Sequence, residues 1–153
     1  MKKKKRVSVL YLKNLQRQVK LDAKNLRKRA KLALETSGFS FKSLGIIFLS
    51  DRKITYYNRE YLRHDRPTDV LSFDLGEGEG EILISAETAA AQARRYRHPL
   101  EEEIVTLIIH GILHLAGYDD TDEGGRRAMF RKTEQILRRT KTLALKGKDG
   151  RKP

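Results

Sequence analysis

Short apolar runs alternate along the chain with segments of helical periodicity, and together they predict a mixed fold. β-Branched and aromatic residues gather in four runs that predict strands, at 7–12, 43–50, 70–74 and 81–85. Apolar residues at helical spacing predict helices over 22–37, 51–61, 85–98, 101–116 and 123–140. Asp22 is expected to cap the first helix, and Gly38 and Gly117 are expected to end helices. The predicted fold class is α+β (α/β mixed), a small mixed β-sheet of about four strands packed with helices.

The chain is expected to form a single domain, 1–153, with basic flexible ends at about 1–6 and 141–153. No internal repeat and no long linker divides the sequence. A chain of this length buries about 70% of the surface that it exposes when unfolded, which is enough for a hydrophobic core.

Positive charge is concentrated at the two ends of the chain. Lysine and arginine number 33 against 20 aspartates and glutamates, a formal net charge of +13. Residues 2–6 carry five of these charges and the segment from Lys141 a net four, so nine of the thirteen lie at the ends. Basic ends attract polyanions through counterion release, and the alternative is that they only keep the protein soluble.

Several classes of protein are excluded by what the sequence lacks. The chain has no cysteine, which rules out a disulfide scaffold, a cysteine zinc site and a thiol nucleophile. The apolar run after the basic N-terminus ends at Lys13 without a cleavage site for a signal peptide. The longest uncharged stretch, 104–118, is shorter than the roughly 20 residues that a membrane span needs. A cytoplasmic location is expected.

Two histidines interrupt an almost wholly apolar helix. The segment 101–117 reads EEEIVTLIIHGILHLAG, so the predicted helix is buried. His110 and His114 are four residues apart, about 40° around the helix, and both rings can point to one place. A buried imidazole needs a polar partner. The pair therefore indicates either a metal site or two histidines hydrogen-bonded to carbonyls or carboxylates.

Carboxylates stand close enough in sequence to complete such a site. Gly117 ends the helix, and Asp119 or Asp120 can turn back over the histidines as a third ligand. Two histidines and a carboxylate leave one position open, which is the pattern of a catalytic zinc site. Glu103, two turns before His110, can orient a ligand or bind substrate. Alternatively, it is an exposed residue stabilised by the helix dipole.

The same motif argues against a zincin-type peptidase. That mechanism needs HExxH, with the glutamate as general base, whereas Gly111 follows the first histidine here. A small residue at this position is expected to leave space beside the metal.

The segment 110–120, HGILHLAGYDD, resembles the HGxLHLxGYDH signature of the YbeY family, the bacterial single-strand endoribonucleases of ribosomal RNA maturation. Motifs further upstream agree, in this order over about 46–120: Asn58, Tyr61, the PTDVLSF block at 67–73, GEILIS at 80–85, which is similar to the family's GDIxIS strand, and Glu103 at a recurrent acidic position.

The resemblance implies a small mixed sheet with packed helices, loosely related to metalloprotease folds, and one zinc ion. It places the metal ligands at His110, His114 and Asp120. The third ligand of the family is usually histidine, so Asp120 is a departure. Another divalent ion is possible, because a carboxylate is a harder ligand than imidazole.

The resemblance also implies phosphodiester cleavage, with Glu103, Asp119 and Arg63 as expected catalytic residues. The two carboxylates would handle protons, and the arginine would stabilise charge on phosphorus. Arg59 and Arg66 are alternatives to Arg63, and any of the three can be an ordinary surface charge. Attack by a metal-activated water and attack by the RNA 2′-OH both stay open.

The implied partners are ribosomal RNA and the ribosome or its small-subunit proteins, and the protein is expected to be a monomer that binds no membrane. The activity implied is maturation of the 3′ end of small-subunit rRNA, and ribosome quality control. Two alternatives remain: a metal-dependent hydrolase of another substrate, and a ribosome-associated binding factor with a structural metal. The basic outer face of the first long helix (Lys24, Arg27, Lys28, Lys31) is a further candidate to follow an RNA backbone.

Overall fold

The computed structural model describes residues 9–62 and 68–150, with side chains as far as Leu143. Nine elements follow one another along these residues: β1 (Val9–Asn14), α1 (Ala23–Ser37), β2 (Ser43–Leu49), α2 (Asp51–Leu62), β3 (Val70–Gly76), β4 (Glu79–Ser85), α3 (Ala86–Tyr96), α4 (Leu100–Leu115) and α5 (Glu123–Gly150).

The four strands form one mixed sheet in the order β1-β2-β4-β3. β1, β2 and β4 are parallel, and β3 pairs with β4 in the antiparallel sense. The parallel pairs need helical crossovers, which α1 supplies between β1 and β2. The predicted α+β class with a small mixed sheet of about four strands is confirmed.

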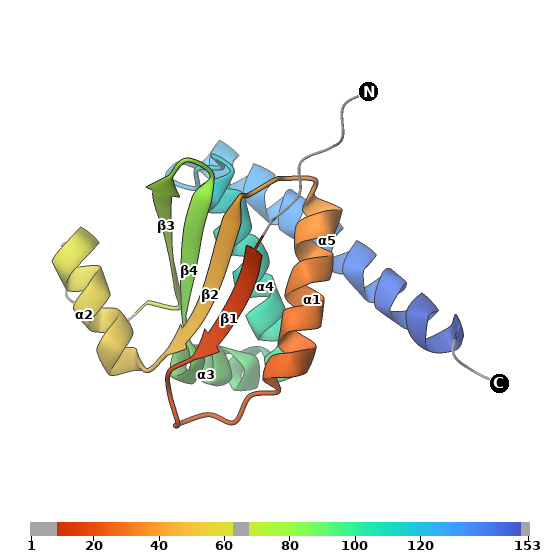
Figure 1. Ribbon diagram of the computed structural model, residues 1–153, viewed down its shortest axis with the longest axis horizontal. Coiled ribbons are helices and arrows are strands. Elements are labelled where there is room, and N and C mark those ends of the chain that lie inside the picture. The colour runs from red at the N-terminus through yellow and green to blue at the C-terminus, as the bar shows by residue number, and fades with distance from the viewer. Residues whose placement is uncertain (1–8, 63–67, 151–153) are drawn as a thin grey trace.

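The main core lies between the sheet and α4, with α1 and α5 beside it (Figure 1). Alternate residues of the central strands point into this core, among them Ile46, Phe48, Ile82 and Ile84, and all four are completely buried. Ile104, Ile108 and Ile112 of α4 meet them from the helix side. α4 is thus the central helix of the molecule, as its apolar sequence predicts.

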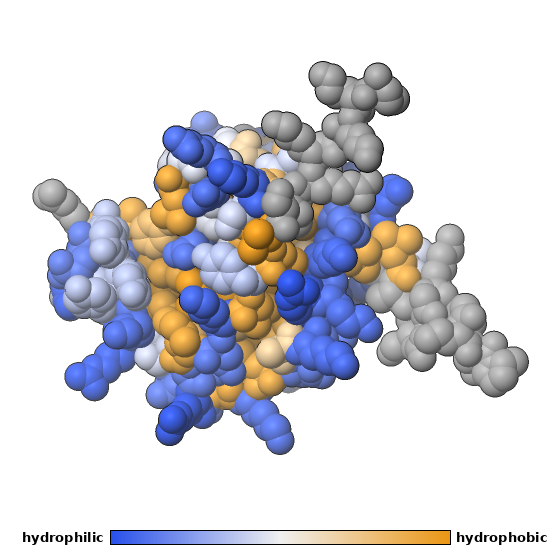
Figure 2. Space-filling model, viewed as in Figure 1, coloured by the Kyte–Doolittle hydropathy of each residue, from blue (hydrophilic) through white to orange (hydrophobic). Residues whose placement is uncertain are grey.

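A second, smaller core covers the opposite face of the sheet. Ile54 of α2 packs there with Leu49, Leu71 and Leu83. Leu83 and its neighbour Ile82 belong to different cores because adjacent strand residues point to opposite faces. Figure 2 shows this side of the molecule, with hydrophobic residues gathered over the sheet and hydrophilic ones along its flanks.

The predicted helix ends are confirmed at three places. The Asp22 carboxylate accepts a hydrogen bond from the backbone N–H of Asn25 and caps α1. Gly38 ends α1 with φ +82°, and Gly117 follows the end of α4 with φ +105°, both in the left-handed region that favours glycine.

Three boundaries differ from the prediction. β1 (Val9–Asn14) ends two residues later than expected, and the predicted residues 7 and 8 lie outside the described part. The turn between β3 and β4 is shorter than predicted, because Glu77 and Gly78 both adopt positive φ and form a two-residue hairpin turn. α5 continues to Gly150 instead of ending near Thr140, so much of the basic C-terminal segment is helical.

Within the described ranges, none of the helices has the length and apolar character that crossing a bilayer requires.

Candidate metal centre

The two histidines lie side by side on one face of α4, near its C-terminal end. Their ring centroids are 4.8 Å apart, and both side chains are about one-third exposed, although the helix around them is buried. The spacing of four residues produces this arrangement, since residues four apart are neighbours on a helix surface. The predicted convergence of His110 and His114 is therefore confirmed.

A tight turn after α4 brings the third group back to the histidines. The N–H of Gly117 donates to the carbonyl of His114, and the N–H of Tyr118 donates to the carbonyl of Leu113. These two bonds are the Schellman pattern, which reverses the chain at a helix end. Asp120 then lies with one carboxylate oxygen, Oδ2, 3.6 Å from Nε2 of each histidine.

The loop that carries Asp120 is fixed against the start of α5. Asp122 Oδ1 accepts a hydrogen bond from the N–H of Gly125 at 2.7 Å, as an N-terminal cap does. The Arg126 guanidinium donates to the carbonyl oxygens of Asp120 and Thr121. Gly125 allows the carbonyl oxygen of Asp119 to lie close to the start of α5, because a Cβ on residue 125 would collide with that oxygen. The position of the carboxylate thus depends on a backbone contact with a glycine.

The geometry fits a divalent metal. The ligand atoms of His110, His114 and Asp120 all lie within 4.8 Å of one another. Any two ligand atoms of a tetrahedral zinc site, each about 2.0–2.1 Å from the ion, are roughly 3.3 Å apart. The 3.6 Å separations between Asp120 and the histidines are close to that value. The donors, two imidazoles and one carboxylate, are a set that zinc accepts with a position left open.

The charge state of His110 also suits a ligand. Burial lowers the pKa of the His110 imidazole and the nearby His114 lowers it further, while Asp69 and Asp120 act in the opposite direction. The outcome is a lowered pKa, which favours the neutral ring. A neutral imidazole has a free lone pair for a metal.

A cleft of about 340 Å³ opens beside His114, between the end of α4 and β3. Val70, Ser72 and Asp74 of β3 form one wall, and His114 and Leu115 form the other. The hydroxyl of Ser72 donates to the carbonyl of Gly111 at 3.2 Å and ties the strand to the helix. The candidate metal centre therefore borders a space that can admit part of a ligand.

Gly111 serves a different purpose from the one predicted. It is buried, and a Cβ on it would lie 2.7 Å from Cγ2 of Ile82 in β4. The expectation that Gly111 leaves space beside the metal is wrong. The missing side chain instead allows α4 to pack closely on the sheet.

Glu103 is neither exposed nor joined to the metal ligands. Its side chain is 9% exposed, and its Oε1 lies 3.1 Å from Nε2 of His98. Burial raises the pKa of the Glu103 carboxyl, with Asp69 adding to the rise and His98 opposing it. Seven residues separate Glu103 from His110, about 10.5 Å along the helix axis. The alternative of an exposed first-turn residue is wrong, and a catalytic role for Glu103 stays a prediction.

Asp69 is the residue near the site to which the sequence motifs gave no role. It lies close enough to both Glu103 and His110 to influence their titration. Gln92 donates to its Oδ2 at 3.3 Å, and its carbonyl accepts from the N–H of Ser85. The sequence did contain a signal for Asp69, because this residue belongs to the PTDVLSF block and directly precedes a strand.

The structure separates Asp119 from Asp120. The Asp119 carboxylate accepts hydrogen bonds from the N–H and the hydroxyl of Thr121, at 3.0 and 3.1 Å, in an exposed turn. Asp120 is accordingly the carboxylate next to the histidines.

Of the three arginines considered for the site, Arg59 alone belongs to the described residues. Arg63 and Arg66 lie outside the described residues. Arg59 is on α2, with Nε 3.6 Å from Glu60 and its guanidinium near the Tyr56 ring. On α1, the Arg27 guanidinium donates to the carbonyl of Leu10 at 2.7 Å, so this cation of the proposed basic face already has a structural partner.

Comparison with known proteins gives consistent relatives. The family model described as Endoribonuclease YbeY matches residues 11–141. The Endoribonuclease YbeY of Syntrophotalea carbinolica is 36% identical over 144 residues, which are 86% of this chain and 96% of that protein. The Endoribonuclease YbeY of Desulforamulus reducens is 41% identical over 143 residues, with 82% and 93% covered.

A solved structure has the same fold. The solution structure of TM1509 from Thermotoga maritima superimposes with a TM-score of 0.63 and 28% sequence identity. The match covers 90% of this chain and 93% of that one.

Proposed function

Since the chain belongs to the endoribonuclease YbeY family, we propose that it is a metal-dependent nuclease that cuts single-stranded ribosomal RNA. The metal is zinc, bound by His110, His114 and Asp120. In this proposal the protein matures the 3′ end of small-subunit rRNA and takes part in quality control of ribosomes. It acts in the cytoplasm as a monomer and binds small-subunit proteins.

One observation carries the proposal: three ligand atoms of suitable chemistry lie within 4.8 Å of one another beside a cleft. A pair of histidines without a carboxylate could serve only to stabilise the fold through hydrogen bonds. The carboxylate at 3.6 Å from both rings, held by its own loop, makes an incomplete coordination shell with room for a further group.

The residues of the chain divide the work around this centre. When bound, a divalent ion supplies an activated water near neutral pH and polarises a phosphoryl oxygen. His110 and His114 hold their place on a rigid buried helix, and Asp120 contributes negative charge that offsets the cation. Glu103 and Asp119 are proposed to handle protons, and Arg63 to stabilise charge on the phosphoryl group.

The products distinguish the two possible nucleophiles. Attack by the 2′-OH breaks the P–O5′ bond and leaves a 2′,3′-cyclic phosphate and a 5′-OH. Attack by water leaves a linear phosphate from the start. End-group analysis of the first products, by mass spectrometry of a defined oligonucleotide, decides between them.

Three variants test the site. His114→Ala and Asp120→Asn are expected to lose metal and RNA cleavage while retaining a cooperative melting transition. Asp119→Asn removes the same charge one residue away and is expected to keep the metal, because its carboxylate faces Thr121. Metal content, melting temperature and cleavage of single-stranded RNA are measured on each.

The outcomes separate the proposal from its alternatives. Folded, metal-free variants that cut RNA as well as the wild type would contradict the assigned site. Unfolding of His114→Ala would instead favour a structural metal. Metal-dependent cleavage of a peptide library, with no cleavage of RNA, would favour a hydrolase of another class.

A further inference from the structure

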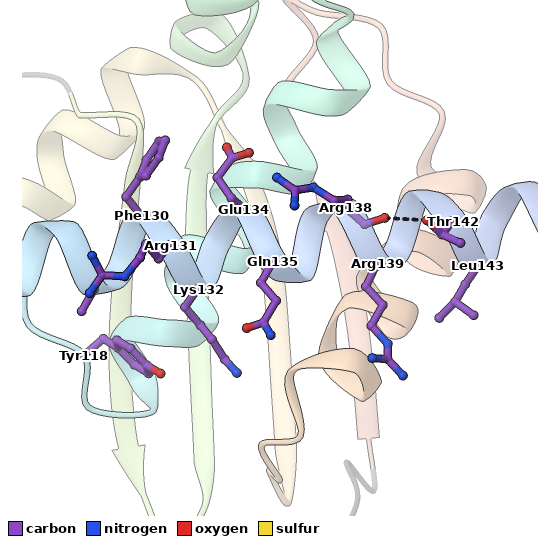
Figure 3. Close-up of a pocket in the computed structure, with 11 residues that line it drawn as sticks. Tyr118, Phe130, Arg131, Lys132, Glu134, Gln135, Arg138, Arg139, Thr142 and Leu143 are labelled. Atoms are coloured by element: carbon purple, nitrogen blue, oxygen red, sulfur yellow. Dashed lines mark hydrogen bonds between the residues drawn. The ribbon is translucent and has the colours of Figure 1, made fainter.

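A basic and aromatic surface lies along α5, next to the loop that carries Asp120. It borders an open space of about 1130 Å³. We call it the α5 outer face, and its members are Tyr118, Phe130, Arg131, Lys132, Arg138 and Arg139. Figure 3 looks onto this face, with Lys132 and Arg139 on the same side of the helix as Tyr118, and Phe130 at the opposite edge.

The periodicity of α5 leaves this face open to solvent. Met129, Thr133, Ile136 and Thr140 are buried and face the rest of the molecule, at spacings of three and four residues. The residues between them therefore point outward. Arg131, Arg138 and Arg139 are exposed, and Lys132 is half-buried.

The four cations of the α5 outer face are available to a ligand. None of them forms an ion pair with another described residue, and Glu134 is the one acid lining the same space. Some cations elsewhere are neutralised by acids: Arg29 pairs with Glu101 and Glu102, and Lys141 pairs with Glu102. The cations of the face recur at intervals of seven residues, about 10.5 Å along the axis. They form a stripe of positive charge, not a single point.

Aromatic rings accompany this stripe. Phe130 is 65% exposed, an unusual degree for a phenylalanine on a helix. Tyr118 lines the space from the side and is supported by an edge-on contact with Phe39, at 6.3 Å between ring centroids. Free cations alone would suit any polyanion, but an exposed ring among arginines suits a base, which stacks on both groups. This combination favours single-stranded nucleic acid over an acidic peptide.

One short loop links the α5 outer face to the candidate metal centre. Tyr118, which lines the space along α5, stands two residues before Asp120, whose carboxylate lies beside the histidines. We propose that the α5 outer face binds the single-stranded flank of the RNA substrate, with phosphates on its cations and a base on Phe130. This inference rests on the proposed function, because it assigns a second contact to the same substrate.

The test compares short and long RNA. A trinucleotide fills the metal centre alone, whereas a single strand of about 12 nucleotides, within the usual site sizes for such surfaces, also reaches α5. Arg138→Gln/Arg139→Gln is expected to raise KM for the longer RNA several-fold and leave kcat and trinucleotide cleavage unchanged. Because each phosphate contact to a single strand contributes about 0.7 to the slope of log affinity against log salt, that slope falls by about 1.4. Phe130→Leu, which removes the ring but retains apolar bulk, raises the same KM about fivefold.

Arg94→Gln/Arg95→Gln is the matched control, since it removes two exposed arginines from α3 and changes the net charge equally. Equal KM values and salt slopes for the α5 and α3 variants would overturn the proposal. So would unchanged RNA affinity together with weaker binding of a polyglutamate peptide, a result that would assign the face to an acidic protein. If the wild type cuts neither RNA, the proposed function fails, and fluorescence anisotropy of the longer RNA still reports whether α5 binds it.

Discussion

Asp120 comes within reach of two histidines through a chain of single-residue constraints. Gly117 supplies the left-handed turn, Asp122 caps the next helix, and Gly125 lets the Asp119 carbonyl approach the first turn of α5. None of these residues offers a metal ligand. Their joint effect is to fix the direction in which one carboxylate points, and precise direction is what a metal site requires.

Replacement of Gly125 by alanine is expected to weaken metal binding about tenfold, because the new Cβ must displace the Asp119 carbonyl and with it the Asp120 loop. Gly124→Ala is the matched control. A Cβ there meets nothing closer than Asp122 Oδ1 at 3.7 Å, and alanine favours a helix over glycine by up to about 1 kcal/mol. Isothermal titration calorimetry with zinc compares the metal affinities of the two variants. Equal affinities would show that the loop is not set by this contact.

Glu103 makes stability depend on pH. A carboxyl whose pKa is raised in the folded state holds its proton more tightly there than in the unfolded chain, and this stabilises the fold below the ordinary glutamate pKa of 4.5. That stabilisation is lost as the pH rises through the raised pKa. Glu103→Gln is therefore expected to gain stability relative to the wild type as the pH rises above 4.5. Urea denaturation across this range measures the difference, and a difference that does not vary with pH would contradict the assignment.

At the scale of elements, the packing of α4 on the sheet holds the histidines in place. α4 approaches β4 closely because Gly111 has no side chain and Ile82 fills the space. The hydroxyl of Ser72 in β3 donates to the carbonyl of Gly111, which adds a polar contact between the sheet and α4. At the N-terminal end of α4, the paired carboxylates of Glu101 and Glu102 bind Arg29 of α1 at 3.0 and 2.6 Å. The helix is thus anchored at both ends.

Gly111→Ala is expected to destabilise the protein by about 1–3 kcal/mol, the usual range for a methyl group forced into a packed core. In an Ile82→Ala background the same change should cost much less, since the atoms that the new Cβ meets have been removed. Chemical denaturation of the four proteins gives the coupling energy. Additive effects would mean that Gly111 and Ile82 do not share this contact.

The order and type of the elements were predictable because their signals are local. Periodicity, the Asp22 cap and the glycine stops lie within a few residues of the structures that they determine. The end of α5 was not predictable in this way, because a basic segment without apolar periodicity continues as a helix to Gly150. The convergence of His110 and His114 was predictable from their spacing along α4, whereas spacing left Asp119 and Asp120 open as the carboxylate and only the family resemblance singled out Asp120. The pairing of Glu103 with His98, the position of Asp69 and the role of Gly111 depend on contacts between elements, which spacing does not reveal.

At the scale of the molecule, positive charge has more than one location. Residues 2–6 hold five positive charges, and the α5 outer face presents four more, next to Tyr118 of the loop that carries Asp120. Charges far in sequence from His110 and His114 are expected to govern affinity for RNA and its dependence on salt, while the metal centre governs the chemical step.

Removal of residues 2–6 tests this division. The shortened chain is expected to bind RNA with a shallower salt dependence, by up to about 3.5 in slope if all five charges contact phosphates. Its metal content and its kcat should match those of the full chain. Binding isotherms at several salt concentrations, with metal analysis of the same samples, provide the comparison. Loss of the metal on this deletion would contradict the division.

A metal ion held by His110, His114 and Asp120 is expected to be required for RNA cleavage, and a zinc titration of metal-free protein measures this requirement. Protein freed of metal by a chelator is supplied with increasing zinc, and the initial rate of cleavage of a single-stranded RNA is measured against the metal bound. We expect no cleavage without metal, a linear rise in rate with bound zinc, and a plateau at one ion per chain. Cleavage at the full rate by the metal-free protein would contradict this requirement.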